Sequence, residues 1–148
     1  YTNVSGGKPL WDIAKDFQAL LGALERGQME YDLGCEDIMA DCASVGRKCL
    51  RVGQTRYHTV VLPAKTENLE SRTFQLMRDF ASSGGRIIAL GLPDYVDGEE
   101  SAELQAFMQS DAVIKMQTPQ EILSLYRQEA DLLVQCPENS HVYHYRCR

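Results

Sequence analysis

The sequence lacks the long runs that would identify a membrane protein or a nucleic-acid-binding protein. No apolar stretch approaches the ~20 residues of a membrane-spanning helix, and the N-terminus has neither the basic nor the apolar region of a signal peptide. No run of Lys and Arg is long enough to neutralise several phosphates, and 15 basic against 21 acidic residues give a net charge of -6. Because a phosphate backbone is bound by clustered basic residues, we expect neither nucleic acid nor a membrane as partner.

The five cysteines lack the close CxxC spacing that zinc sites use, so no metal site is expected. Cys42 falls on the apolar side of a predicted helix, and Cys49 begins a predicted strand. Both are therefore expected to be buried free thiols. The chain also lacks an initiator Met, which is consistent with the loss of a segment upstream.

A compact domain is indicated by the composition, which is 44% hydrophobic and 24% charged over 148 residues. The strongest local pattern lies at residues 9–26, where apolar side chains recur at helical spacing between Pro9 and Gly27. Trp11 follows an inward-facing Leu10 in this predicted helix, so we expect its ring to pack rather than to bind a ligand.

The rest of the chain predicts alternating strands and helices. Strands are expected at 29–33, 48–52, 56–63, 86–90 and 112–116, and helices at 36–43, 67–83, 100–109 and from 119 onward. The second and third strands are separated by a Gly-Gln pair and are expected to form a hairpin-like pair. The run Val60, Val61, Leu62 is typical of a strand buried on both faces. The segment TPQE at 118–121 is a capping box that begins the last helix.

This alternation predicts an α/β fold with a doubly wound, mostly parallel sheet in three α/β/α layers. The first helix has no strand before it, since YTNVSGGK is polar and rich in glycine, so the first strand of the sheet is expected to be missing. Residues 1–135 are expected to form the α/β domain. Residues 136–148 are expected to be a linker and the first strand of a following β-domain, because 141–148 alternates Tyr and Cys with His and Arg.

Several segments, in order, carry a family resemblance: YDLGCEDIM, LRVGQTRYHTVVLP, GGRIIALGLPDYVDG and VYHYR. Together they resemble the flavodoxin-like, or class I glutamine-amidotransferase-like, domain of large bacterial glycoside hydrolases. The rhamnosidase-type enzymes are the nearest cousins, and in β-galactosidases the domain is called the trimerisation domain. The resemblance covers roughly residues 9–146.

The resemblance implies a non-catalytic accessory domain that serves domain packing or oligomerisation. Its partners would be the catalytic barrel and the β-sandwich of the same polypeptide, with a homo-oligomer as a further possibility. It also implies a periplasmic or secreted location. The catalytic acids would then lie in the barrel, outside this chain.

The loop after the predicted strand 86–90 lies at the carboxyl end of a sheet strand, where many α/β enzymes carry their chemistry. An amidotransferase-like site needs a nucleophilic Cys at this turn with a His beside it, but the turn reads Gly91, Leu92, Pro93. The acidic residues that follow are interpreted as a solvated loop that stabilises the next helix. We therefore expect no catalytic residue here. The candidates for a contact surface on this loop are Pro93, Asp94, Tyr95 and Asp97.

Two other functions stay open. The first is a free-standing, flavodoxin-like small-ligand-binding domain, which would bind at the carboxyl ends of its strands. Its only candidate phosphate cradle is SGGK at residues 5–8, which lacks the GxGxxG and Walker spacings, so no cofactor is expected. The second is a degenerate amidotransferase-like enzyme.

Overall fold

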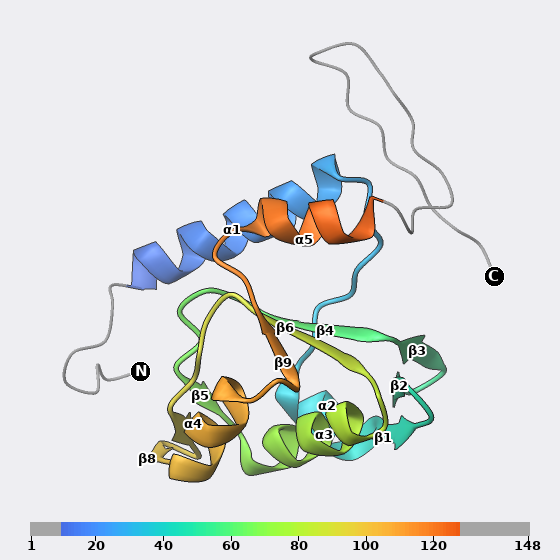
Figure 1. Ribbon diagram of the computed structural model, residues 1–148, viewed down its shortest axis with the longest axis vertical. Helices are drawn as coiled ribbons and strands as arrows, with labels where there is room; N and C mark the ends of the chain where they lie inside the picture. Colours follow the sequence, from blue (N-terminus) through green and yellow to red (C-terminus); the bar gives the residue numbers. More distant parts are fainter. Residues whose placement is uncertain (1–9, 128–148) are drawn as a thin grey trace.

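The computed structural model describes residues 10–127 and shows an α/β fold (Figure 1). The helices are α1 (Leu10–Arg26), α2 (Glu36–Cys42), α3 (Ser71–Ser82), α4 (Ala102–Gln109) and α5 (Pro119–Tyr126). The strands are β1 (Ala43–Gly46), β2 (Cys49–Val52), β3 (Thr55–Tyr57), β4 (Thr59–Leu62), β5 (Asn68–Leu69), β6 (Arg86–Ala89), β7 (Tyr95–Val96), β8 (Glu99–Glu100) and β9 (Val113–Lys115).

The central sheet is parallel, with the strand order β4-β6-β9. Helix α3 connects β4 to β6, and α4 connects β6 to β9. Parallel neighbours need such crossover helices, because a tight turn can join only antiparallel strands. The predicted mostly parallel sheet is therefore confirmed.

The two faces of the central sheet carry separate clusters of apolar side chains. On β6, Ile87 and Ala89 belong to the cluster that α3 and α4 cover, whereas Ile88 packs with Leu20 of α1 and Ile122 of α5. Successive side chains of a strand point to opposite faces, so one strand serves both clusters. Helices α1 and α5 lie on one side of the sheet, and α2, α3 and α4 lie on the other (Figure 1). The expected α/β/α layering is thus present.

The predicted hairpin-like pair is confirmed as β2 and β3, which pair antiparallel from Leu50↔Tyr57 to Val52↔Thr55. The expected single strand over 56–63 is divided, however, because the chain bends at His58. Its first part, β3, belongs to the antiparallel sheet β1-β2-β3, and its second part, β4, belongs to the parallel sheet. Strand β1 was not predicted.

The expected strand over 29–33 is not formed. This segment lines a cavity, and no strand within residues 10–127 pairs with it. A strand without a neighbour leaves its N–H and C=O groups unpaired, so an apolar alternation alone does not make one. Two packing predictions were also wrong: Trp11 is 77% exposed, and Cys42 is exposed, whereas Cys49 is buried as expected.

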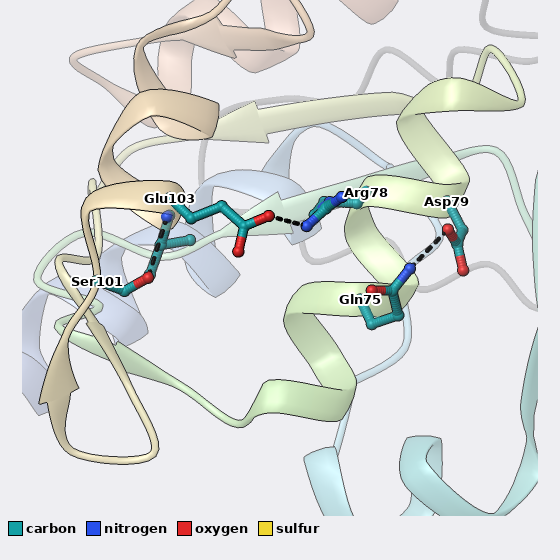
Figure 2. Close-up of polar contacts among 6 residues, drawn as sticks. Gln75, Arg78, Asp79, Ser101 and Glu103 are labelled. Carbon is teal, nitrogen blue, oxygen red and sulfur yellow. Dashed lines mark hydrogen bonds and ion pairs between the residues drawn. The ribbon is translucent and has the colours of Figure 1, made fainter.

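Helices α3 and α4 are joined at their surface (Figure 2). The Arg78 guanidinium on α3 forms an ion pair with the Glu103 carboxylate on α4 and lies 5.6 Å from the centre of the Phe74 ring. Ser101 caps α4, because its hydroxyl oxygen accepts a hydrogen bond from the Leu104 N–H at 3.2 Å. The Arg78–Glu103 ion pair therefore joins the two crossover helices, whereas the Ser101 hydrogen bond acts within α4.

The predicted capping box of α5 is confirmed: the Glu121 carboxylate accepts the Thr118 N–H at 3.1 Å, with Pro119 in the first turn. No helix within residues 10–127 is long and apolar enough to cross a membrane. The expected strand at 141–148, the division at 135/136 and the SGGK segment lie outside the described residues.

Candidate functional site

The loop that follows β6 begins as a buried structural segment. A Cβ atom at Gly91 would lie 2.5 Å from the Pro63 carbonyl oxygen, so only glycine allows the two loops to approach this closely. The Pro93 side chain is fully buried. Of the four candidate contact residues, Pro93 therefore contributes to packing inside the molecule.

The second half of the loop is a hairpin made by β7 and β8. Asp97 and Gly98 both have positive φ, 52° and 84°, as a two-residue type I′ turn requires. The Asp97 carboxylate accepts a hydrogen bond from the Ser71 N–H at 2.9 Å, and the Gly98 N–H donates to the Asn68 side chain at 2.7 Å. The Asp-Gly pair was a signal for this hairpin that the sequence analysis missed.

Asp97 is exposed, and so are the other two remaining candidates, Asp94 and Tyr95, of which Tyr95 is 42% exposed. The Asp94 and Tyr95 N–H groups both donate to the Glu67 carbonyl oxygen at 3.1 Å, and the Asp94 carbonyl oxygen accepts the Ser101 N–H at 2.8 Å. Because the backbone is used internally, the loop offers side chains rather than peptide groups to a partner.

Within residues 10–127, the Cys and His that an amidotransferase-like site would need are not assembled around this loop. The turn after β6 offers only Gly91, Leu92 and Pro93. His58 lies before β4, and its Nδ1 is hydrogen-bonded to the Lys48 carbonyl oxygen at 2.8 Å. Within residues 10–127, no three His, Cys, Asp or Glu side chains are placed to hold a metal ion.

Carboxylates gather at the N-terminal end of α3. Glu36 accepts a hydrogen bond from the Glu70 N–H at 3.1 Å, and Asp97 accepts one from the next N–H, that of Ser71. Desolvation raises the pKa of the Glu70 carboxyl group, and the nearby charges of Glu36, Asp37 and Asp97 raise it further. The Glu36 and Asp97 carboxylates stabilise the helix end, since its free N–H groups attract negative charge, whereas a charge on Glu70 is disfavoured by theirs.

A large cleft lies beside β4, with a volume of about 1700 Å³. We call it the β4 cleft. One wall is the apolar side of α1, the opposite wall comes from α2 and α3, and residues 28–35 and β4 complete it. Its apolar lining includes Phe17, Leu20, Leu24, Met29, Val61, Leu76 and Met77.

The β4 cleft was not predicted, although the sequence contains a signal for it. The run from Val60 to Leu62 predicts a strand buried on both faces, yet Val60 and Val61 are only half-buried. β4 is the terminal strand of its sheet, so this apolar run leaves an apolar surface uncovered at the sheet edge.

Tyrosine hydroxyl groups form the polar rim of the β4 cleft. The Tyr57 hydroxyl donates to Asp32 at 2.7 Å, and the Tyr31 hydroxyl donates to Glu25 at 3.1 Å. Desolvation and the carboxylate that each contacts raise the pKa of both phenols. A further hydrogen bond joins the Thr59 and Tyr126 hydroxyl groups, which ties the start of β4 to α5.

Comparison with protein-family models, with curated proteins and with solved structures finds no match for this chain.

Proposed function

We propose that this chain is a non-catalytic accessory α/β domain of a multidomain glycoside hydrolase, in which it serves domain packing or oligomerisation. The observation that supports this role best is the β4 cleft, an apolar hollow of about 1700 Å³ at the margin of the central sheet. Apolar surface that the described residues leave uncovered at the edge of a sheet is typical of protein interfaces.

Two exposed apolar side chains lie in the β4 cleft, and two more lie elsewhere on the surface, at the start of α1. Leu33 and Ile38 line the cleft and are 62% and 56% exposed. At the start of α1, Leu10 is 82% and Trp11 77% exposed. Aromatic side chains are enriched at protein interfaces, and transfer of these groups from water to a partner would stabilise the assembly.

The parent enzyme class comes from the resemblance of the segments quoted above. Under this proposal, the partners are the catalytic barrel and β-sandwich of the same polypeptide, and the location is periplasmic or secreted. Asp94 and Tyr95 on the loop after β6 would provide a second contact, since a tyrosine presents an apolar ring and a hydrogen-bonding hydroxyl together.

A small-ligand-binding domain is the competing function, and its test is direct. The volume of the β4 cleft exceeds the 300 to 1,000 Å³ that is usual for small-ligand pockets, at about 1700 Å³. Thermal unfolding of the chain should be unchanged by a saturating concentration of flavin mononucleotide. A rise in the melting temperature with this ligand would favour the binder over the packing domain.

Self-association is the positive test of the packing role. Sedimentation of the isolated chain should show concentration-dependent association that Leu33→Glu weakens, because the new charge would be buried in the contact. The matched control is Leu125→Glu on α5, where the side chain is 36% exposed and does not line the β4 cleft. Equal effects of the two substitutions would contradict the proposed contact surface.

A further inference from the structure

Strand β4 has one paired edge and one open edge within the described part of the chain. It is the terminal strand of the order β4-β6-β9. The carbonyl oxygens of His58 and Leu62 accept hydrogen bonds from Arg86 and Leu90, at 3.2 and 3.0 Å, on the β6 side. Because peptide groups in a strand alternate in direction, those of Thr59 and Val61 point away from β6, into the β4 cleft.

The β4 cleft continues the plane of the central sheet. Its walls belong to helices of the two outer layers, α1 on one side and α2 with α3 on the other, and its floor is β4. Helices on both faces normally enclose a sheet, not empty space. The cleft therefore has the shape that accommodates a further strand of the sheet.

The far side of the β4 cleft is residues 29–33, which join the two helix layers (Figure 1). Met29, Tyr31 and Leu33 alternate with the polar Glu30 and Asp32, as in a half-buried strand. The segment has no strand to pair with inside residues 10–127. Two strand-compatible segments thus face each other across an apolar gap.

An unpartnered polar group lies in the same cavity lining. The Thr73 hydroxyl on α3 is buried, with the residue 6% exposed, and it has no hydrogen-bond partner among the described residues. Buried hydroxyl groups are normally paired, because an unpaired one costs free energy. This group is available to an occupant of the β4 cleft.

We infer that the β4 cleft receives an extended, apolar polypeptide strand that inserts between β4 and residues 29–33. The strand runs parallel to β4, as every strand of the central sheet does. It pairs with the peptide groups of Thr59 and Val61 on one side and converts 29–33 into a strand on the other. This main-chain recognition is β-augmentation, with the apolar walls binding the side chains.

The inference deepens the packing role proposed above and rests on it only for the source of the strand. A suitable probe is a synthetic peptide, acetyl-KTVIVVDK-amide, whose apolar centre matches a strand buried on both faces. The control peptide has the same side chains but carries N-methyl groups on two successive central residues. This control peptide keeps the apolar side chains, but it loses one N–H donor toward β4 and one toward residues 29–33.

Amide hydrogen exchange of the full 148-residue chain is the readout. With saturating peptide, exchange of the Thr59 and Val61 amides should slow by at least about tenfold, whereas Val60 and Leu62, already paired to β6, should change little. The N-methylated peptide should leave all four unchanged. A spin label at the N-terminus of the peptide should broaden resonances near Thr59, and one at its C-terminus should broaden those near Leu62.

Four results would overturn the inference. Equal protection by the two peptides would show a purely apolar binding site, and no protection by either would show no strand site. The reversed pattern of spin-label broadening would contradict the parallel orientation. Protection of Thr59 and Val61 before peptide is added, in a dimer, would identify a second copy as the occupant. The flavin test above uses no peptide, so its outcome is independent of these. The sedimentation test concerns the same cleft, because Leu33 lines it, and peptide protection in a chain that does not self-associate would support the strand site without the oligomer.

Discussion

The Asp97 carboxylate and the Ser71 N–H are joined by a hydrogen bond of 2.9 Å, which connects the turn of the β7–β8 hairpin to the beginning of α3. The two residues are far apart in the sequence, and they come together because β7 pairs with β5, directly before that helix. The loop at the end of β6 is thereby attached to the helix on one face of the sheet.

Substitutions at Asp97 should separate its two structural roles. Asp97→Gly keeps the positive φ of 52° accessible and removes the hydrogen bond to Ser71, so we expect a loss of about 1 kcal/mol in the free energy of unfolding. Asp97→Ala should lose about 1 kcal/mol more, because alanine is strained at this φ. Urea denaturation measures both. Asp97→Asn is the control that retains both functions, and a loss as large as that of Asp97→Ala would contradict this assignment.

Gly91→Ala should destabilise the domain by about 2 kcal/mol, through steric contact with backbone atoms. The added Cβ would lie 2.5 Å from the Pro63 carbonyl oxygen and 3.0 Å from the Lys65 and Thr66 nitrogens. Gly53→Ala is the comparison, since its Cβ would meet nothing within 4 Å and only its φ of 57° is strained. If urea denaturation shows a smaller loss in the free energy of unfolding for Gly91→Ala than for Gly53→Ala, the loop after β6 moves to accommodate the new Cβ atom, which would contradict the prediction.

Glu70 should destabilise the domain when it is ionised. Desolvation, together with the charges of Glu36, Asp37 and Asp97, raises the pKa of Glu70 in the folded state above its value in the unfolded chain. The folded state therefore binds the proton more tightly, and stability is lost as the pH rises through the folded-state pKa. Glu70→Gln should be more stable than the parent chain at pH 7 and equal to it below the unfolded pKa. Urea denaturation at pH 3.5 and at pH 7 measures the difference in the free energy of unfolding between Glu70→Gln and the parent chain. The same difference at both pH values would contradict the prediction.

Thr73→Val should stabilise the domain by about 1 kcal/mol, because it removes a buried hydroxyl group that has no partner in the described residues. Thr73→Ser is the matched control: it keeps the hydroxyl and loses a methyl group from the core, so it should destabilise. Thermal unfolding of the three proteins checks the order. If Thr73→Val unfolds at a lower temperature than the parent chain, the hydroxyl has a partner in solution.

The long, regular elements of this fold were predictable from the sequence. The apolar spacing of α1 and α3 and the capping box of α5 are local signals, and so is the apolar run of β6. They were sufficient for the α/β fold and for the order of the crossover units. Strands β5, β7 and β8 have only two residues each, so they carry almost no periodicity.

The failures of the sequence analysis concentrate at the β4 cleft and the margin of the fold. Residues 29–33 have the alternation of a strand, and the beginning of α1 has the apolar spacing of a buried helix, but Leu10 and Trp11 are exposed. Periodicity reports which side chains suit a buried environment and not whether a neighbour supplies it. The β4 cleft depends on such tertiary contacts, so it became visible only in the structure.

The mass of the native polypeptide that carries this sequence tests the packing role most directly. An antibody raised against the 16.7 kDa chain would capture that polypeptide from its source, and its intact mass would be measured. We expect a species several times larger, whose glycoside hydrolysis can then be assayed with and without this domain. A species close to 16.7 kDa would contradict the assignment to a multidomain enzyme.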